Sequence, residues 1–175
     1  ARANYTYSKN KYVYVDEPSY PYVWQTQTGK PLDAMRGYIA EGLFCDEEEI
    51  KASPDQSLFG STIMPGDIKY RDVNGDNRIT AEDQVTLSPY GNMPRIQYGF
   101  GISLQWKDLD VSVFFNGSAK RTIMLSGMYP FCANDSNDNN LMQWIADSHW
   151  SEGKDNSNVV YPRLGALSTQ ITNNT

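Results

Sequence analysis

Two neighbouring stretches near the middle of the chain alternate between apolar residues and small or polar ones. In residues 98–106 one alternate set is Tyr98, Phe100, Ile102, Leu104 and Trp106, and the other is Gly99, Gly101, Ser103 and Gln105. Residues 109–117 repeat the pattern with Leu109, Val111, Val113 and Phe115 on one side. Successive side chains of an extended chain point to opposite faces, so the pattern predicts two strands that each have one apolar face. Because only Lys107 and Asp108 separate them, we expect a tight hairpin.

The other predicted elements are shorter. Alternating tyrosines between Asn4 and Val15 indicate one or two short strands. Residues 46–54 predict a short helix, because Asp46 can cap its first turn, the glutamates that follow favour that turn, and Pro54 ends it. A second short helix is predicted within residues 140–150 from the apolar spacing of Leu141, Trp144 and Ile145.

Long polar segments separate these elements. They divide the chain into a strand region at 1–15, a long loop at 16–95, the hairpin at 96–117 and a second loop region at 118–175. Connections of such length in compact proteins are usually functional surface loops. The expected fold class is therefore mainly β, with two short helices and long loops.

Composition narrows the functional classes. At 175 residues the chain has the length of one domain, and 15 basic against 21 acidic residues give a net charge of -6 without any basic run. We therefore do not expect the chain to bind nucleic acid. No apolar run has the length of a transmembrane helix, but a strand of a membrane barrel needs only about 9–11 alternating residues.

Residues 72–83 match a calcium loop of the EF-hand or dockerin kind. Ca²⁺ prefers six to eight oxygen ligands, about 2.3–2.6 Å away. The pattern supplies side-chain oxygens at loop positions 1, 3, 5 and 12 and a backbone carbonyl at position 7; the expected ligands are Asp72, Asn74, Asp76, Arg78 and Asp83. Thr80 stands at position 9, where contact often runs through water, and Ile79 at the position that normally turns into the core. A structural calcium ion is the cofactor that this spacing predicts.

The loop departs from the EF-hand pattern in two places. Asn77 replaces the usual glycine at position 6, and asparagine tolerates the left-handed backbone that the turn requires. Asp83 replaces glutamate, as in dockerin loops, and no long helix precedes Asp72, which disfavours a helix–loop–helix sensor. The alternative is a turn rich in Asp and Asn that only resembles a metal loop.

Other residues offer weaker candidates. The single histidine, His149, adjoins Asp147 and Ser148, and three contiguous residues cannot converge as a catalytic triad. Glu47 to Glu49 are better explained as a solvated helix face than as paired acids. The aromatic residues from Tyr20 to Trp24 could stack on sugar rings or pack against neighbouring loops. No catalytic site is expected.

The two cysteines, Cys45 and Cys132, have no CxxC motif and no metal-ligand spacing. They could pair in an oxidising compartment or remain free thiols. The sequence leaves both alternatives open.

Taken in order, several motifs resemble one family. They are Gly42-Leu-Phe, the acidic helix ending at Ala52-Ser-Pro, Pro65-Gly-Asp-Ile-Lys-Tyr, Asp72-Val-Asn-Gly-Asp, Tyr98-Gly-Phe-Gly, Leu109-Asp-Val-Ser-Val-Phe-Phe-Asn-Gly and Tyr161-Pro-Arg-Leu. The series is similar to the SusC/RagA family of TonB-dependent outer-membrane transporters of Bacteroidetes, and it covers residues 3–164. Asn77, where the family usually has glycine, and both cysteines depart from the family pattern.

The resemblance implies an internal fragment of the later part of a transmembrane β-barrel in the outer membrane. Residues 16–95 and those from 118 onward would then be extracellular loops, and Lys107-Asp108 a periplasmic turn. It implies import of glycans or peptides, a SusD-like surface lipoprotein as partner, and contact with TonB through parts outside this chain. A soluble dockerin-like binding module is the alternative from another class. A secreted carbohydrate-active enzyme is disfavoured, since no paired-acid site is visible.

Overall fold

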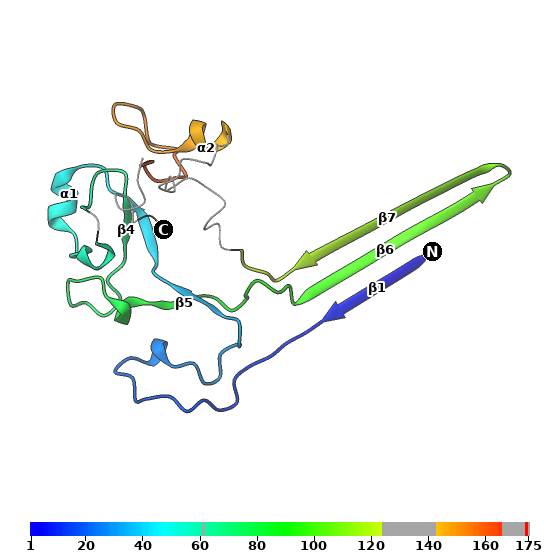
Figure 1. Cartoon of the computed structure of the whole chain (residues 1–175), viewed down its shortest axis with the longest axis horizontal. Helices are drawn as coiled ribbons and strands as arrows, with labels where there is room; N and C mark the ends of the chain where they lie inside the picture. Colours follow the sequence, from blue (N-terminus) through cyan, green and yellow to red (C-terminus); the bar gives the residue numbers. More distant parts are fainter. Residues whose placement is uncertain (61, 124–142, 166–173, 175) are drawn as a thin grey trace. The chain divides into compact units, whose positions relative to one another are not determined.

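The computed structural model describes residues 1–60, 62–123, 143–165 and 174, which belong to two separate units (Figure 1). The first unit takes in Ala1–Gly37 and the described residues from Thr86 to 123. The second takes in Tyr38–Val85 and the described residues from 143 onward. The two units are described in turn.

An antiparallel three-stranded sheet dominates the first unit. Its strands are β1 (Arg2–Tyr7), β6 (Ile96–Trp106) and β7 (Leu109–Ala119), and β6 lies between the other two. The expected hairpin of β6 and β7 is confirmed, and each strand runs slightly beyond its predicted limits. Lys107 adopts a left-handed φ of 53° in the two-residue turn, which lets Trp106 pair directly with Leu109.

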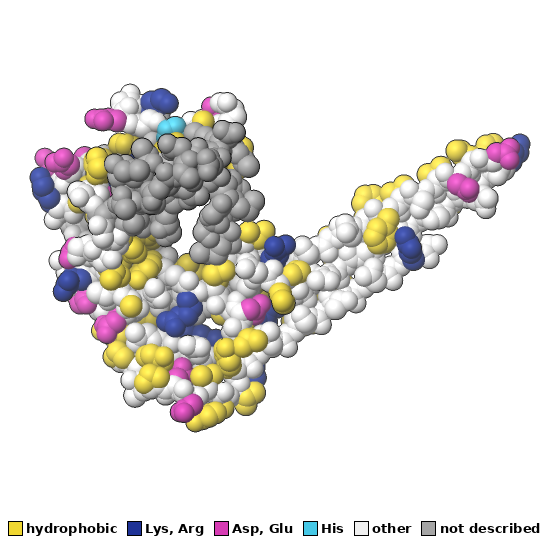
Figure 2. All heavy atoms as spheres, viewed as in Figure 1, with side chains coloured by type: hydrophobic (Ala, Val, Ile, Leu, Met, Phe, Trp, Pro, Cys, Tyr) yellow, Lys and Arg dark blue, Asp and Glu magenta, His cyan; other side chains and the backbone are white. Residues whose placement is uncertain are grey.

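The register of the sheet places most of the large apolar residues of its three strands on one face. Phe100 pairs with Phe115 and Leu104 with Val111, while Tyr5 of β1 pairs with Tyr98 of β6. The rings of Phe100 and Phe115 stack with centroids 5.0 Å apart. Figure 2 shows hydrophobic side chains gathered along one side of the hairpin. Most of this apolar face is solvent-exposed within the described chain; its exposed members include Tyr98, Phe100, Ile102, Leu104, Trp106, Leu109, Val111, Val113 and Phe115.

The opposite face of the sheet carries mainly small and polar residues. Ser103 and Ser112 pair across the strands, and their hydroxyl oxygens lie 2.9 Å apart. Phe114 is the large exception, and its ring lies over Gly101, where an added Cβ would come within 2.7 Å of a ring carbon. Glycine at that position therefore makes room for an aromatic ring on the polar face.

A smaller folded segment accompanies the sheet in the first unit. It contains the 3₁₀ turn η1 (Val23–Gln25) and the two-stranded pair of β2 (Met35–Gly37) with β5 (Val85–Ser88). Arg95, which directly precedes β6, is 7% exposed and donates to Asp33 Oδ1 at 3.2 Å and to the carbonyl of Pro89 at 3.1 Å. This buried guanidinium ties the segment to the end of the sheet.

The second unit consists of short elements around a small core. Strand β3 (Ala40–Leu43) pairs with β4 (Ile68–Tyr70), and the helices are α1 (Glu47–Ala52) and α2 (Gln143–Ser148), with 3₁₀ turns η2 (Ser57–Phe59) and η3 (Ala81–Asp83). Asp46 caps α1 by accepting from the amide of Glu49, as predicted. The described core consists of Phe44, Tyr70, Ile79 and Ile145.

A buried carboxylate joins distant parts of the second unit. Asp67 is fully buried and accepts from the guanidinium of Arg163, with Nε 2.5 Å from Oδ1, and from Asn174 Nδ2 at 2.9 Å. A backbone hydrogen bond joins the same two segments, since Arg163 N donates to the carbonyl of Gly66 at 2.9 Å. Gly66 has a φ of 87°, and an added Cβ would lie 2.4 Å from the ring of Trp150. The motifs Pro65-Gly-Asp and Tyr161-Pro-Arg therefore form one cluster.

The mainly β class and the two short helices are confirmed. Leu141, one of the residues on which the second helix was predicted, lies outside the described residues. Within the described ranges no helix has the length and apolar character needed to cross a membrane. The four-part division at 15, 95 and 117 stays a prediction.

Candidate metal-binding loop

Residues 72–78 form a tight loop that is held by side-chain hydrogen bonds to its backbone. Asp72 accepts from the amides of Gly75 and Asn77, both at 2.7 Å. Asn74 Oδ1 accepts from Asp76 N at 3.0 Å, so the loop is a chain of short Asx turns. Asn77 adopts the left-handed conformation expected at position 6, with a φ of 64°.

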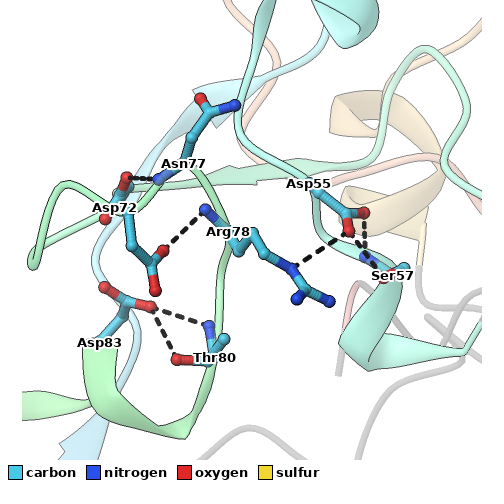
Figure 3. Close-up of polar contacts among 8 residues, drawn as sticks. Asp55, Ser57, Asp72, Asn77, Arg78, Thr80 and Asp83 are labelled. Carbon is cyan, nitrogen blue, oxygen red and sulfur yellow. Dashed lines mark hydrogen bonds and ion pairs between the residues drawn. The ribbon is translucent and has the colours of Figure 1, made fainter.

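The middle of the loop is anchored to the core and to a neighbouring segment (Figure 3). Ile79 is 1% exposed, which confirms its predicted inward orientation. The backbone of Asp55 lies beside the loop, accepting from Ile79 N at 2.8 Å and donating to the carbonyl of Asn77 at 3.1 Å. The Arg78 side chain turns to the Asp55 carboxylate, with Nε 3.7 Å from Oδ2. No sequence signal pointed to Asp55 as the partner of this loop.

Asp83 closes the loop through hydrogen bonds to its two ends. The side chain is fully buried, and Oδ1 accepts from Val73 N at 2.8 Å and from Asn74 N at 3.2 Å. Its Oδ2 accepts from Thr80 N at 2.8 Å and faces Thr80 Oγ1 at 3.4 Å. Figure 3 shows both contacts to Thr80. Asp83 and Thr80 thus form a capping box at the start of η3.

The predicted calcium ligands are neighbours in the loop, and the carboxylate at position 12 is engaged in hydrogen bonds. A calcium loop needs the position-12 carboxylate as a ligand, whereas Asp83 directs both oxygens at N–H and O–H donors. Over the ranges that the structure describes, no group of three or more His, Cys, Asp or Glu side chains is placed to hold a metal. Calcium binding by Asp72, Asn74, Asp76, Arg78 and Asp83 stays a prediction.

The elements that flank the loop differ from those of an EF-hand. Strand β4 ends at Tyr70, one residue before the loop, and the 3₁₀ turn η3 forms the last three residues of the loop. The sequence predicted that this loop is not part of a helix–loop–helix unit, and the observed flanking elements agree with that prediction.

The weaker sequence candidates take structural roles in their described contacts. His149 Nδ1 lies 2.8 Å from the carbonyl of Ala146, and Nε2 lies 2.9 Å from Ser151 Oγ, so the ring bonds within its own turn. Glu49 binds Cys45 N at 2.9 Å and Lys69 Nζ at 2.9 Å. The Cys45 amide, followed by the Lys69 ammonium, lowers the pKa of Glu49, so this carboxyl is not suited to act as a general acid.

The aromatic stretch at the start of η1 packs on itself. The rings of Tyr22 and Trp24 stack with centroids 4.6 Å apart and planes 7° apart. Each ring therefore covers one face of the other, which favours the packing alternative over sugar stacking for those faces. Val23 between them is 87% exposed.

Cys45 is an exposed free thiol, and Cys132 lies outside the described residues. The pairing of the two cysteines stays open. Cys45 also lies at the margin of an open cleft of about 800 Å³ in the second unit. Trp150, Met64 and the loop at 152–157 line this cleft, which no sequence pattern had indicated.

Comparison with known proteins gives a partial match. No family model matches the chain. Over 91 residues it is 35% identical to TonB-dependent receptor P26 of Formosa agariphila. The match covers 51% of this chain but only 8% of that receptor. The chain is therefore similar, over half its length, to a small part of a TonB-dependent receptor, and this similarity does not single out the SusC/RagA family.

Proposed function

We propose that this chain is part of a TonB-dependent transporter of the SusC/RagA kind in a bacterial outer membrane, where it belongs to the wall and outer loops of a β-barrel. It would serve uptake of a glycan or peptide and carry out no catalysis itself. The ordered motif series supports the family, and the receptor with which the chain shares 35% identity comes from a Bacteroidetes species.

The observation that carries the proposal is the apolar face of the β1–β6–β7 sheet. Its large side chains are exposed, with Leu104 and Trp106 at 68% and 69%. Soluble monomers rarely expose apolar patches larger than several hundred Å². A membrane barrel instead requires an apolar outer face and a polar inner one, alternating along each strand.

Strand length agrees with this assignment. Strand β6 has 11 residues. At about 3.4 Å per residue and a tilt of about 45°, a strand of that length spans about 26 Å along the membrane normal. This equals the height of the apolar band of outer-membrane barrels, about 25 Å.

The connections suit the same orientation. The tight turn at Lys107 and Asp108 has the length of a periplasmic turn, and the long chain between β1 and β6 that of an extracellular loop. In this assignment the loops face the cell exterior, where they would meet the nutrient and a SusD-like lipoprotein. Contact with TonB would lie in parts of the protein outside this chain.

A cysteine scan along β6 tests the proposal. Single cysteines at residues 102 to 105 of the complete protein, with Cys45 and Cys132 replaced by serine, would carry an environment-sensitive fluorophore in lipid vesicles. We expect brominated lipid to quench the label at Ile102 and Leu104, and aqueous iodide to quench it at Ser103 and Gln105. A label at Lys107 serves as the aqueous control. Equal quenching of neighbouring positions by iodide would refute the lipid-facing assignment.

A further inference from the structure

The lone pairs of the Asp83 carboxylate decide whether loop 72–83 can hold a cation in its present form. A carboxylate offers about four acceptor sites. Four donors point at this one: Val73 N, Asn74 N, Thr80 N and Thr80 Oγ1. Because the side chain is fully buried, solvent does not compete for these sites. No acceptor capacity remains for a metal ion at the ligand that would close a calcium loop.

The same hydrogen bonds hold the loop closed, as a bound cation would. Val73 and Asn74 begin the loop, and Thr80 lies at its far side. By binding both, the Asp83 carboxylate joins the two ends around one negative charge. Ile79 is thereby held in the core.

We propose that the buried Asp83 carboxylate, and not a divalent cation, closes loop 72–83 in the folded protein. The loop would then be a metal-independent clamp that fixes Asn77 and Ile79 against the Asp55 segment. Calcium could enter only if Asp83 first released its donors, leaving the amides of Val73, Asn74 and Thr80 without their partner. The inference concerns the fold of this loop alone and stands or falls independently of the proposed transport.

Two Asp→Asn variants in the same loop separate the clamp from a calcium site. In Asp83→Asn an amide nitrogen replaces one acceptor oxygen and faces N–H donors. In the wild type, Arg78 N lies 2.8 Å from Asp76 Oδ1. In Asp76→Asn the remaining carbonyl oxygen can still accept this hydrogen bond, so the Asx turn survives. A calcium site would require both carboxylates, whereas the clamp requires only Asp83.

The measurement is hydrogen–deuterium exchange of the peptides covering residues 72–83, in the complete protein, with excess calcium or with EGTA. We expect the wild type to exchange alike in both. We expect Asp83→Asn to exchange about tenfold faster or more, and Asp76→Asn to remain close to wild type.

The opposite result is equally clear. If calcium slows exchange in the wild type by about tenfold or more, and Asp76→Asn abolishes the effect, a cation closes the loop and the clamp is wrong. Should Asp83→Asn fail to fold, the wild-type comparison between calcium and EGTA still decides between the two.

Discussion

The two units of this protein differ in how far their large apolar side chains are exposed to solvent. In the sheet, Phe100 and Leu104 are 49% and 68% exposed, whereas in the second unit Phe44 and Ile79 are each 1% exposed. The sheet has regular pairing over 11 residues, but among the described residues none forms a core on its apolar face. The second unit has little regular structure and yet has a core.

The difference shows where each unit obtains its stability. The sheet's apolar face must be covered by something outside the described chain, and lipid is the cover proposed here. The second unit is held by its few buried apolar residues together with two buried carboxylates, Asp67 and Asp83, which bond backbone amides and distant side chains. Substitutions in the sheet should therefore change stability through its contacts with whatever surrounds it. Substitutions in the second unit should change stability by breaking hydrogen bonds and ion pairs within the protein.

The largest effect is expected from breaking the buried ion pair of the second unit. In Asp67→Ala the guanidinium of Arg163, 12% exposed, would lose its carboxylate partner. Loss of one member of a buried pair costs about 3–5 kcal/mol of stability. Exchange of the Phe44 and Gly66 amides should accelerate accordingly.

The control for this change is Glu41→Ala, which breaks the exposed contact of Arg71 with Glu41 at 2.7 Å. An exposed pair contributes about 0–1 kcal/mol. Equal acceleration in the two variants would mean that the Asp67 cluster does not organise the second unit.

A somewhat smaller effect is expected from a charge on the apolar face of the sheet. Ile102→Arg lies near the middle of β6, where an arginine facing lipid costs a membrane barrel about 2–4 kcal/mol. The fraction of complete protein that folds into lipid vesicles, read from heat-modifiable gel mobility, should fall. Ser103→Arg, one residue away on the polar face, should fold like the wild type. Similar losses in both variants would show that the faces do not differ in environment.

The smallest effect is expected from alkaline pH in the second unit. Burial raises the pKa of Tyr70 from 10.0 to about 12. The folded state therefore favours the neutral phenol, and its contribution of about 2–3 kcal/mol is complete below pH 10 and is lost as the pH rises towards 12. Tyr70→Phe should remove this alkaline loss of stability and one late step in the tyrosinate absorbance titration. A wild-type titration without a late step would contradict the assignment.

Sequence periodicity predicted the elements that are long and locally determined. The hairpin follows from alternation over two runs with a two-residue gap, and α1 from Asp46 and the acidic first turn. Strands β2 to β5 have only three or four residues each, too few for alternation to show. Their pairing depends on partners far along the chain, and so does the bond between Asp67 and Arg163.

Two features of the candidate loop were predicted, but its contacts were not. Spacing correctly placed Ile79 inward and Asn77 in the left-handed region. It could not tell whether Asp83 faces a cation or amides, because the same residue type serves both purposes. The Asp55 segment beside the loop depends on tertiary packing, which no local pattern reports.

The pairing of Tyr7 with Ile96 has an evolutionary consequence. The chain leaves the sheet after Tyr7 and re-enters it at the directly opposite residue, so everything between is one insertion at a single point of the sheet. Such an insertion can be lengthened, exchanged or replaced by a short turn while the hydrogen-bonded strands keep their register. The sheet can thus remain constant while the inserted chain diversifies.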